Sequence, residues 1–233
     1  MTTFPEGIRW LSDRLAWCSL PQARIEKLSS ADFGPLSLTK TVRFCRMLQK
    51  YLETFEVVVV CCSDHPHRRA NSAALVCLYS VLVSGKSAQQ AYAPFVKIEP
   101  PLHPFRDAGF GPCTFPLLLI AVLKGVEHSV TKCGHFDAAS YDLERFEALE
   151  RLENGDVSWI VPGKIFAFSS PHDRRRPIGQ DSSTDKFALS ARDCSRLFKT
   201  MGVACVVRFN GNVYDKRAFT ANGIRHVDLE YED

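Results

Sequence analysis

Residues 57–83 read VVVVCCSDHPHRRANSAALVCLYSVLV, and this stretch limits the possible folds more than any other part of the chain. The β-branched run from Glu56 to Cys62 is continuous, as expected of a parallel strand that is buried on both faces. Asn71–Val83 is apolar and long enough for a helix, and a short polar loop separates it from the strand. A strand, loop and helix in this order predict an α/β fold.

The loop after this strand contains Cys62 and Arg68, a Cys-x5-Arg spacing that is the minimal signature of cysteine-dependent phosphatases. Such an enzyme holds a thiolate near backbone N–H groups at a helix N-terminus, and its arginine binds two phosphate oxygens. The tight curve around the phosphate needs a glycine where this chain has His65, and the following Pro66 has no N–H to donate. We therefore interpret the loop as degenerate and not catalytic.

Two other interpretations of the cysteines are weaker. Cys18 and Arg24 have the same spacing, but Pro21 stands where the glycine should be, so we interpret this pair as a coincidence. Paired Cys-x2-Cys spacing, which structural zinc sites usually show, is absent from the sequence. We therefore predict no metal site from the residues that come close enough in sequence to suggest one: Cys61, Cys62, His65, His67, Cys133 and His135.

Composition narrows the classes of partner and the compartment. A formal charge of +3 over 233 residues suggests neither nucleic acid nor an anionic membrane as a partner. The N-terminus lacks a signal-peptide pattern, and apolar runs such as Phe115–Leu123 are too short to cross a bilayer. Nine cysteines, several of them in apolar segments, indicate reduced thiols. We expect a cytoplasmic and/or nuclear protein that is not secreted.

Hydrophobic periodicity and turn residues predict the remaining elements and a domain border. The Asn-Gly-Asp turn at 154–156 indicates the border, so we expect one domain to end at residue 153 and a second to cover residues 154–233. In the first domain the pattern predicts helices at Thr39–Leu52 and Phe115–Lys124, with a loop at Glu99–Thr114. In the second it predicts a hairpin at Trp159–Ser169, a helix at Phe187–Met201 and a strand at Ala204–Phe209.

The segment Phe136–Glu153 is acidic and has helical periodicity. Four apolar residues recur every three positions and predict one buried stripe: Leu143, Phe146, Leu149 and Leu152. The outward positions carry glutamates, at 144, 147, 150 and 153. From the charge pattern alone, a solvated helix face is the simplest interpretation.

Several longer strings carry a resemblance to a known family. They are ADFGPLSL (31–38), PFRDAGFGPCTF (104–115), ERLENGDVSWIVPGKIFAFSSPH (150–172), VVRFN (206–210) and YDKRAFTANGIRHVDL (214–229). Together they resemble the Cdc-fourteen family of dual-specificity protein phosphatases. The resemblance extends from about Asp32 to the end of the sequence, and the first thirty residues show no useful match. We therefore expect an N-terminal extension at 1–30 and a first domain at 31–153.

The resemblance implies tandem dual-specificity-phosphatase-like domains, the first degenerate and the second catalytic. The Cys62–Arg68 loop matches the inactive copy of the phosphate loop in the family's first domain. Asp233 matches the general acid that protonates the leaving oxygen. The nucleophilic cysteine and the phosphate-binding arginine follow later in the family, so we expect this chain to be truncated, its second domain to be incomplete and the chain alone to be inactive.

The family also implies a substrate and the residues that bind it. Its members dephosphorylate phosphoserine and phosphothreonine in phosphoproteins, in cell-cycle control and without a cofactor. They prefer phosphoserine followed by proline, with a basic residue downstream. The positions that match its acidic substrate groove are Asp107, Glu147, Glu150 and Asp156. For these four the resemblance favours a groove over a solvated face.

Three functional hypotheses remain open from the sequence. The first is the N-terminal part of a dual-specificity phosphatase. The second is a non-catalytic binding module that recognises basic peptides through its acidic groove. The third is an active phosphatase that uses Cys62, and it requires that a Cys62→Ser variant lose hydrolytic activity.

Overall fold

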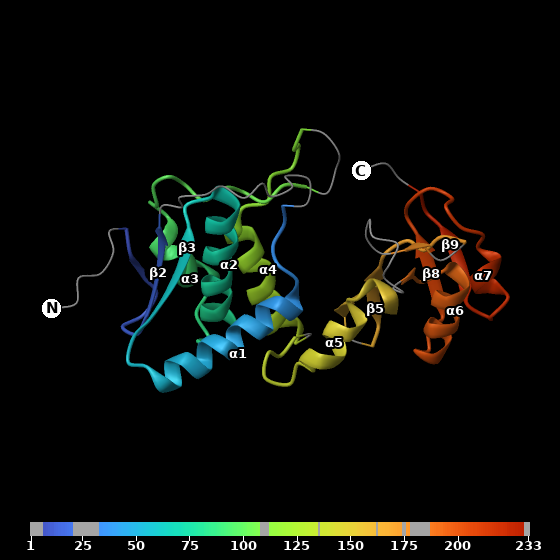
Figure 1. Ribbon diagram of the computed structural model, residues 1–233, viewed down its shortest axis with the longest axis horizontal. Coiled ribbons are helices and arrows are strands. Elements are labelled where there is room, and N and C mark those ends of the chain that lie inside the picture. The colour runs from blue at the N-terminus through green and yellow to red at the C-terminus, as the bar shows by residue number, and fades with distance from the viewer. Residues whose placement is uncertain are drawn as a thin grey trace. The chain divides into compact units, whose positions relative to one another are not determined.

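A computed structural model describes residues 7–20, 33–107, 112–134, 136–161, 163–173, 176–177 and 187–230. The chain forms two compact units, residues 1–141 and 142–233, which are described separately below (Figure 1). Strands and helices occur in both units, which confirms a mixed α/β protein. The second unit begins at residue 142, before the predicted border after Glu153, because Leu149 packs against the hydrophobic core of that unit.

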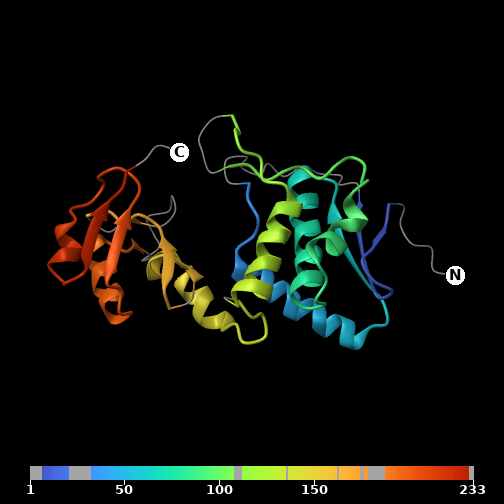
Figure 2. The same cartoon turned by 180° about the vertical axis from the view of Figure 1, so that it is seen from behind.

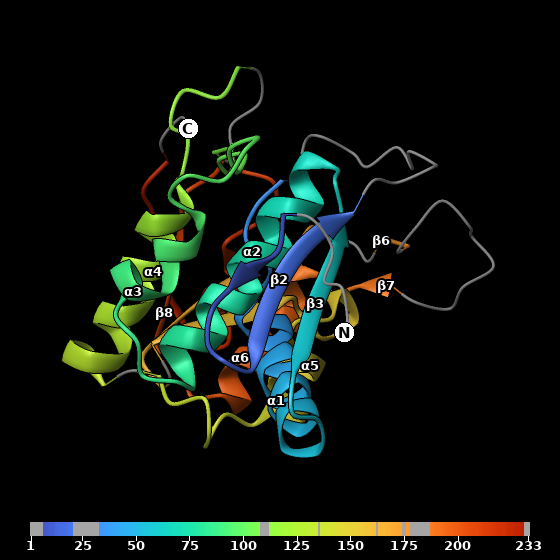
Figure 3. The ribbon, with the colours of Figure 1, turned by 90° about the vertical axis from the view of Figure 1, so that its left-hand side faces the viewer.

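The first unit contains a three-stranded sheet in the order β1-β2-β3. Its described elements are β1 (Arg9–Trp10), β2 (Leu15–Leu20), α1 (Leu38–Thr54), β3 (Val58–Ser63), α2 (Pro66–Leu82), α3 (Ala88–Tyr92), a 3-10 turn (Ala93–Phe95), α4 (Leu119–His128) and a π-helical turn (Ser129–Cys133). β1 is antiparallel to β2, whereas β2 and β3 run parallel (Figure 3). The parallel pairing of β3 agrees with the prediction.

Residues 9–20 differ from the predicted N-terminal extension, because they form two strands of the first unit's sheet. Trp17 is fully buried, and its ring meets the Phe95 ring edge-on at 5.2 Å. The Arg14 side chain, in the turn before β2, donates to Glu56 O at 3.0 Å and to Phe55 O at 2.9 Å. Arg14 thereby satisfies carbonyl groups that follow the end of α1 and fixes the β1–β2 turn against that helix.

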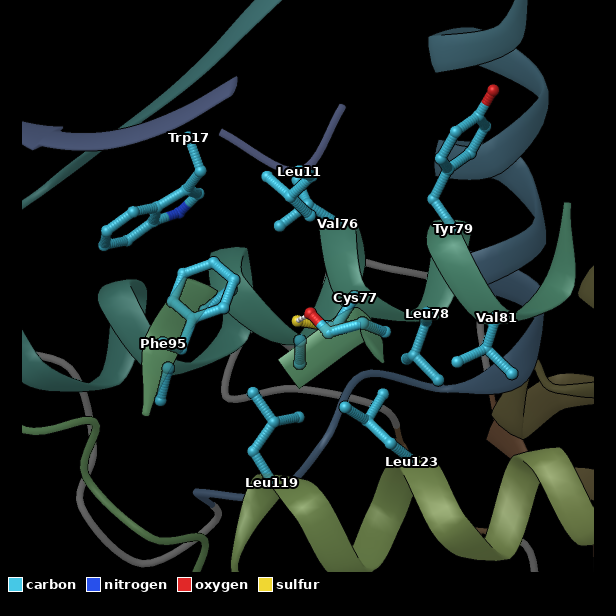
Figure 4. Close-up of a cluster of buried hydrophobic side chains, with 14 of the residues drawn as sticks. Leu11, Trp17, Val76, Cys77, Leu78, Tyr79, Val81, Phe95, Leu119 and Leu123 are labelled. Carbon is cyan, nitrogen blue, oxygen red and sulfur yellow. Dashed lines mark hydrogen bonds between the residues drawn. The ribbon is translucent and has the colours of Figure 1, made fainter. Parts of the chain in front are cut away.

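The core of the first unit is centred on α2, which contacts β3 on one side and α4 on another (Figures 1 and 2). Most of its residues between 69 and 81 are buried, as expected of a helix that is apolar on nearly all sides. Leu119 and Leu123 of α4 point toward α2, and Trp17 and Phe95 close another side of the cluster (Figure 4). Each large side chain buried here contributes about 1.5–3 kcal/mol of hydrophobic stabilisation.

Two helix starts and the burial of one strand differ from the predictions in this unit for local reasons. α2 begins at Pro66 rather than Asn71, since proline is well suited to the first helical position. α4 begins at Leu119 rather than Phe115, because Leu117 pairs with Phe105 in an antiparallel bridge. β3 is half-buried rather than buried on both faces, and it lies at the edge of the described sheet, with Cys61 exposed.

The second unit has its own core and several short sheets. Its described elements are α5 (Leu143–Leu149), a 3-10 turn (Leu152–Asn154), β4 (Val157–Val161), β5 (Ile165–Phe168), β6 (Arg176–Pro177), β7 (Phe187–Ala188), α6 (Ala191–Thr200), β8 (Cys205–Arg208), α7 (Arg217–Thr220) and β9 (Arg225–Asp228). The β4–β5 hairpin and strand β8 agree with the predicted elements, and β8 is parallel to β9. Phe198 and Phe219 are fully buried at the centre of this core. The helix predicted to start at Phe187 begins instead after Ser190, whose side chain caps it.

The acidic segment Phe136–Glu153 is not one long helix, contrary to the periodicity. The Asp137 carboxylate accepts hydrogen bonds from Ala139 N and Ser140 N, and Asp142 caps α5 by accepting from Arg145 N at 3.1 Å. Such local side-chain bonds compete with helix formation, so the helix is restricted to Leu143–Leu149. The expected apolar stripe is only half-buried, and Leu152 is 41% exposed.

No helix in the described part of the chain combines the length and apolar character needed to span a membrane.

Candidate functional site

The Cys62–Arg68 loop connects the carboxyl end of β3 to the N-terminus of α2, as the sequence predicted. An open pocket of about 720 Å³ lies at this junction. Its polar lining comes from β3, the loop and the first turns of α2: Cys61, Cys62, Ser63, His67, Arg68, Asn71 and Ser72. The two residues of the Cys-x5-Arg spacing therefore share one pocket, in the place that a phosphate-binding loop would have.

The Cys62 thiol lies in an environment that favours its protonated form. Burial raises the pKa of Cys62 above its ordinary value, although a hydrogen bond to the Ser72 side chain and the charge of Arg69 act in the opposite direction. The Ser72 hydroxyl also accepts a 2.9 Å hydrogen bond from Trp17 Nε1, which fixes its position. Because the thiolate is the reactive form of cysteine, a raised pKa makes Cys62 a poor nucleophile at neutral pH.

The N-terminus of α2 offers few free backbone N–H groups. Pro66 occupies the first turn and has no N–H. The His67 N–H points to His65 Nδ1 at 3.3 Å, and the Arg69 N–H donates to His65 O at 2.9 Å. A phosphate held here would lack the cradle of N–H groups that anion sites at helix N-termini use.

The two arginines after the loop have different surroundings. Arg68, the arginine of the Cys-x5-Arg spacing, is half-buried and lines the pocket. Arg69 is 3% exposed and donates from Nη2 to Pro100 O at 2.7 Å. Arg69 therefore fixes the segment around Pro100 against the start of α2.

Three histidines gather beside the loop. The His67 ring stacks on Phe33 with a centroid distance of 3.8 Å, and the rings of His65 and His103 lie within 5.3 and 5.6 Å of it. Burial, followed by the proximity of His65 and His103, lowers the pKa of His67. In the described residues, no group of three or more His, Cys, Asp or Glu side chains is arranged to hold a metal ion.

Asp107, a predicted groove residue, is hydrogen-bonded to residues 114 and 115. Its Oδ2 accepts hydrogen bonds from Thr114 N at 2.8 Å, Thr114 Oγ1 at 3.1 Å and Phe115 N at 2.9 Å. The backbone N–H groups of Phe115 and Thr114 lower the pKa of Asp107, so it is ionised at neutral pH. Its Oδ1 lies 3.8 Å from Arg106 Nη2.

The other predicted groove acids belong to the second unit. Glu147 lies on α5 and Glu150 directly follows it, and both are half-buried. Asp156 has a left-handed backbone (φ 50°), and its Oδ2 accepts a hydrogen bond from Ser169 Oγ, which connects it to the β4–β5 hairpin. Asp107 belongs to the first unit, so a groove that includes all four stays a prediction. Asp233, the candidate general acid, lies outside the described residues.

A polar network in the second unit was not predicted from the sequence. Arg208, at the end of β8, is 7% exposed and donates from Nε to Asp228 Oδ1 at 2.9 Å and from Nη1 to Tyr214 O at 2.8 Å. The Tyr214 hydroxyl is hydrogen-bonded to His226 Nε2 at 2.9 Å. Burial tends to raise the pKa of Asp228, but the charge and hydrogen bond of Arg208, together with His226 and Lys216, outweigh it, and the pKa lies below its ordinary value. The only sequence signal is that strands β8 and β9 each end in a charged residue.

Comparison with known proteins shows which protein family this chain resembles. A family model described as "Dual specificity protein phosphatase, N-terminal half" matches residues 11–129, and its span begins inside the stretch where we saw no resemblance. The chain is 37% identical to dual specificity protein phosphatase CDC14A of Homo sapiens, over 87% of this chain and 34% of the relative. It is 30% identical to tyrosine-protein phosphatase CDC14 of Saccharomyces cerevisiae, over 95% of this chain and 41% of the relative. The chain thus spans about a third of the length of the human relative.

Proposed function

Because the chain belongs to the CDC14 family of dual-specificity protein phosphatases, we propose that it forms the substrate-recognition part of an enzyme that dephosphorylates phosphoproteins. The observation that carries this proposal is the match of residues 11–129 to the N-terminal half of such phosphatases. The chain spans about a third of its human relative, so the proposal concerns the part that it contributes.

In this proposal the first unit is a degenerate phosphatase domain that serves as a scaffold. Three observations support a loop that does not form a phosphocysteine. The pKa of Cys62 is raised, a proline begins α2, and Arg69 donates a hydrogen bond to Pro100 O. The second unit is the first part of the catalytic domain, and Asp233 is its general acid. The nucleophilic cysteine and its arginine belong to a segment of the family's catalytic domain that the residues of this chain do not match.

The proposed substrate is a phosphoserine followed by proline, with a basic residue downstream. A basic peptide requires negative charge in its binding groove, and the candidates are Asp107, Glu147, Glu150 and Asp156. The ionised state of Asp107 supports this assignment. We propose that the protein acts in the cytoplasm and/or nucleus, on phosphoproteins of the cell cycle.

Peptide binding tests this proposal with a control on the same helix. Fluorescence anisotropy measures the Kd of the 233-residue chain for a labelled peptide that contains phosphoserine, proline and a downstream lysine. Reversing charge in a Glu147→Lys/Glu150→Lys variant should weaken binding about tenfold, from about 0.7 kcal/mol for each charge. Glu144→Lys, on the exposed face of α5, should leave the Kd within about twofold. Equal Kd values for the unaltered chain, the double variant and the Glu144→Lys variant would contradict the proposal that Glu147 and Glu150 line a peptide-binding groove.

The same assay separates a second candidate function, a non-catalytic module that binds basic peptides. The acidic helix α5 favours this alternative as well as the first proposal. A recognition part of a phosphatase specific for phosphoserine followed by proline should lose affinity when that proline is replaced by alanine. Binding that depends on Glu147 and Glu150 but is unchanged by this replacement would support the module instead.

A further inference from the structure

Two cysteines on neighbouring strands of the first unit have their sulfur atoms in contact. Cys18 of β2 lies opposite Cys61 of β3 in the parallel register. The distance between the two Sγ atoms is 3.1 Å. Strands β2 and β3 therefore present two free thiols side by side, although the residues are 43 positions apart in the sequence.

The two thiols differ in their access to solvent. Cys61 is exposed and lines the pocket of about 720 Å³ beside the Cys62–Arg68 loop. Cys18 is fully buried, and burial followed by the contact with Cys61 raises its pKa to about 12. A dissolved oxidant therefore reaches the exposed Cys61 thiol, whereas the Cys18 thiol is shielded from solvent.

The geometry of the pair suits a disulfide with little movement of the backbone. Paired strands lie about 4.8 Å apart, which is inside the Cα–Cα range of about 4.4–6.8 Å that disulfides allow. The sulfurs need to approach from 3.1 Å to a bond length of about 2.05 Å. Cys62 is less well placed, because successive side chains of a strand point to opposite faces and its Sγ lies 3.7 Å from the Cys18 carbonyl oxygen.

We propose that Cys18 and Cys61 form a reversible disulfide when the chain meets a peroxide. In the first step the Cys61 sulfur attacks hydrogen peroxide, the O–O bond breaks, and sulfenic acid and one water form. In the second step the neutral Cys18 thiol, held 3.1 Å from the Cys61 sulfur, passes its proton to the sulfenic oxygen as its sulfur attacks the Cys61 sulfur, so that the S–O bond breaks and a second water leaves. Two thiols lose two electrons in total, and one peroxide is reduced to two waters. A small thiol such as glutathione reverses the reaction by thiol–disulfide exchange.

This cross-link would join the central strand β2 of the first unit's described sheet to its edge strand β3. It closes a chain segment of 43 positions, which restricts the unfolded state more than the folded one. The thermal midpoint of the first unit should rise by about 10 °C on oxidation. A cross-link of this kind in a reducing compartment is transient and responds to oxidants.

Mass spectrometry of the whole chain tests the proposal directly. The folded chain is treated with hydrogen peroxide, its remaining thiols are alkylated in denaturant so that the buried ones also react, and the digest is analysed without reduction. We expect two of the nine thiols to be lost to alkylation, a linked pair of peptides that contains Cys18 and Cys61, and recovery of both thiols after dithiothreitol. The thermal midpoint is recorded on the same oxidised and reduced samples.

Variants of Cys61 and Cys62, together with the other possible oxidation products, distinguish the proposed disulfide from its alternatives. Cys61→Ser should abolish the cross-link, whereas Cys62→Ser, one residue along the same strand, should keep it. Since a change at the buried Cys18 can disturb folding, the linked-peptide map of the unaltered chain is the primary result. The proposal is overturned if all nine thiols stay alkylatable, if Cys61 ends as a sulfinic acid, or if it is linked to another cysteine such as Cys62.

Discussion

Replacing Trp17 with alanine should destabilise the first unit more than any change at an exposed residue of the same segment. Trp17 lies on β2, is fully buried and packs edge-on against Phe95 at 5.2 Å (Figure 4). Its Nε1 donates to Ser72 Oγ at 2.9 Å. The change therefore removes a large apolar side chain, an aromatic contact and a hydrogen bond that connects the sheet to α2.

These contacts set the expected size of the effect. Truncation of a buried aromatic residue to alanine costs about 3–5 kcal/mol through lost burial and the cavity left behind. The hydrogen bond to Ser72 contributes about 1 kcal/mol and the ring contact with Phe95 about 0.5–1.5 kcal/mol, partly overlapping with the first figure. The free energy of unfolding should therefore fall by about 4–5 kcal/mol, which moves the urea midpoint by about 2 M.

Urea titration followed by circular dichroism measures this change, and Trp10→Ala provides a matched control. Trp10 lies on β1 and is 41% exposed, so its truncation should cost less than about 1 kcal/mol. Ser72→Ala should cost about 1 kcal/mol, and its effect should shrink in the Trp17→Ala background. Equal costs for Trp10→Ala and Trp17→Ala would refute the assignment of residues 9–20 to the core of the first unit.

Two further predictions concern the two cores. Leu123→Ala, at a fully buried position of α4, should lower the unfolding free energy by about 2–5 kcal/mol, whereas Leu118→Ala, at a residue that is 56% exposed, should change it by about 0.5 kcal/mol or less in urea titrations. Burial lowers the pKa of His226, so the unfolded chain takes up a proton more readily than the folded second unit. Stability of that unit should be full above the ordinary histidine pKa of about 6.5 and should decline as the pH falls below it, and His226→Gln should flatten this decline in melting curves between about pH 7.5 and pH 5.5. An identical pH dependence in the variant would contradict the role of His226.

Elements with strong local patterns were predictable from the sequence. Helix α1 follows from apolar residues at helical spacing, and β3 follows from its β-branched run. The β4–β5 hairpin follows from short apolar runs on either side of Gly163, which has a positive φ. These features depend on residues that are close together in the chain.

The features that were missed depend on distant residues or on side-chain capping. Strand β2 has six residues with no clear periodicity, and its place in the sheet is set by pairing with β3. The acidic helix is shortened because Asp142 caps it, which competes with continued helix. At the candidate site the sequence located the Cys62–Arg68 loop, but the contact of Arg69 with Pro100 joins residues 31 positions apart and carried no local signal.

Hydrolysis of a chromogenic phosphate ester tests the central claim most directly, namely that the Cys62–Arg68 loop is a scaffold and not a nucleophile site. The release of nitrophenol from para-nitrophenyl phosphate is followed at several concentrations of the 233-residue chain and of its Cys62→Ser variant. The raised pKa of Cys62 and the missing N–H cradle predict the same background rate for both chains at every concentration. A rate that grows with the concentration of the unaltered chain and disappears in the Cys62→Ser variant would contradict the account, because Cys62 would then be the nucleophile.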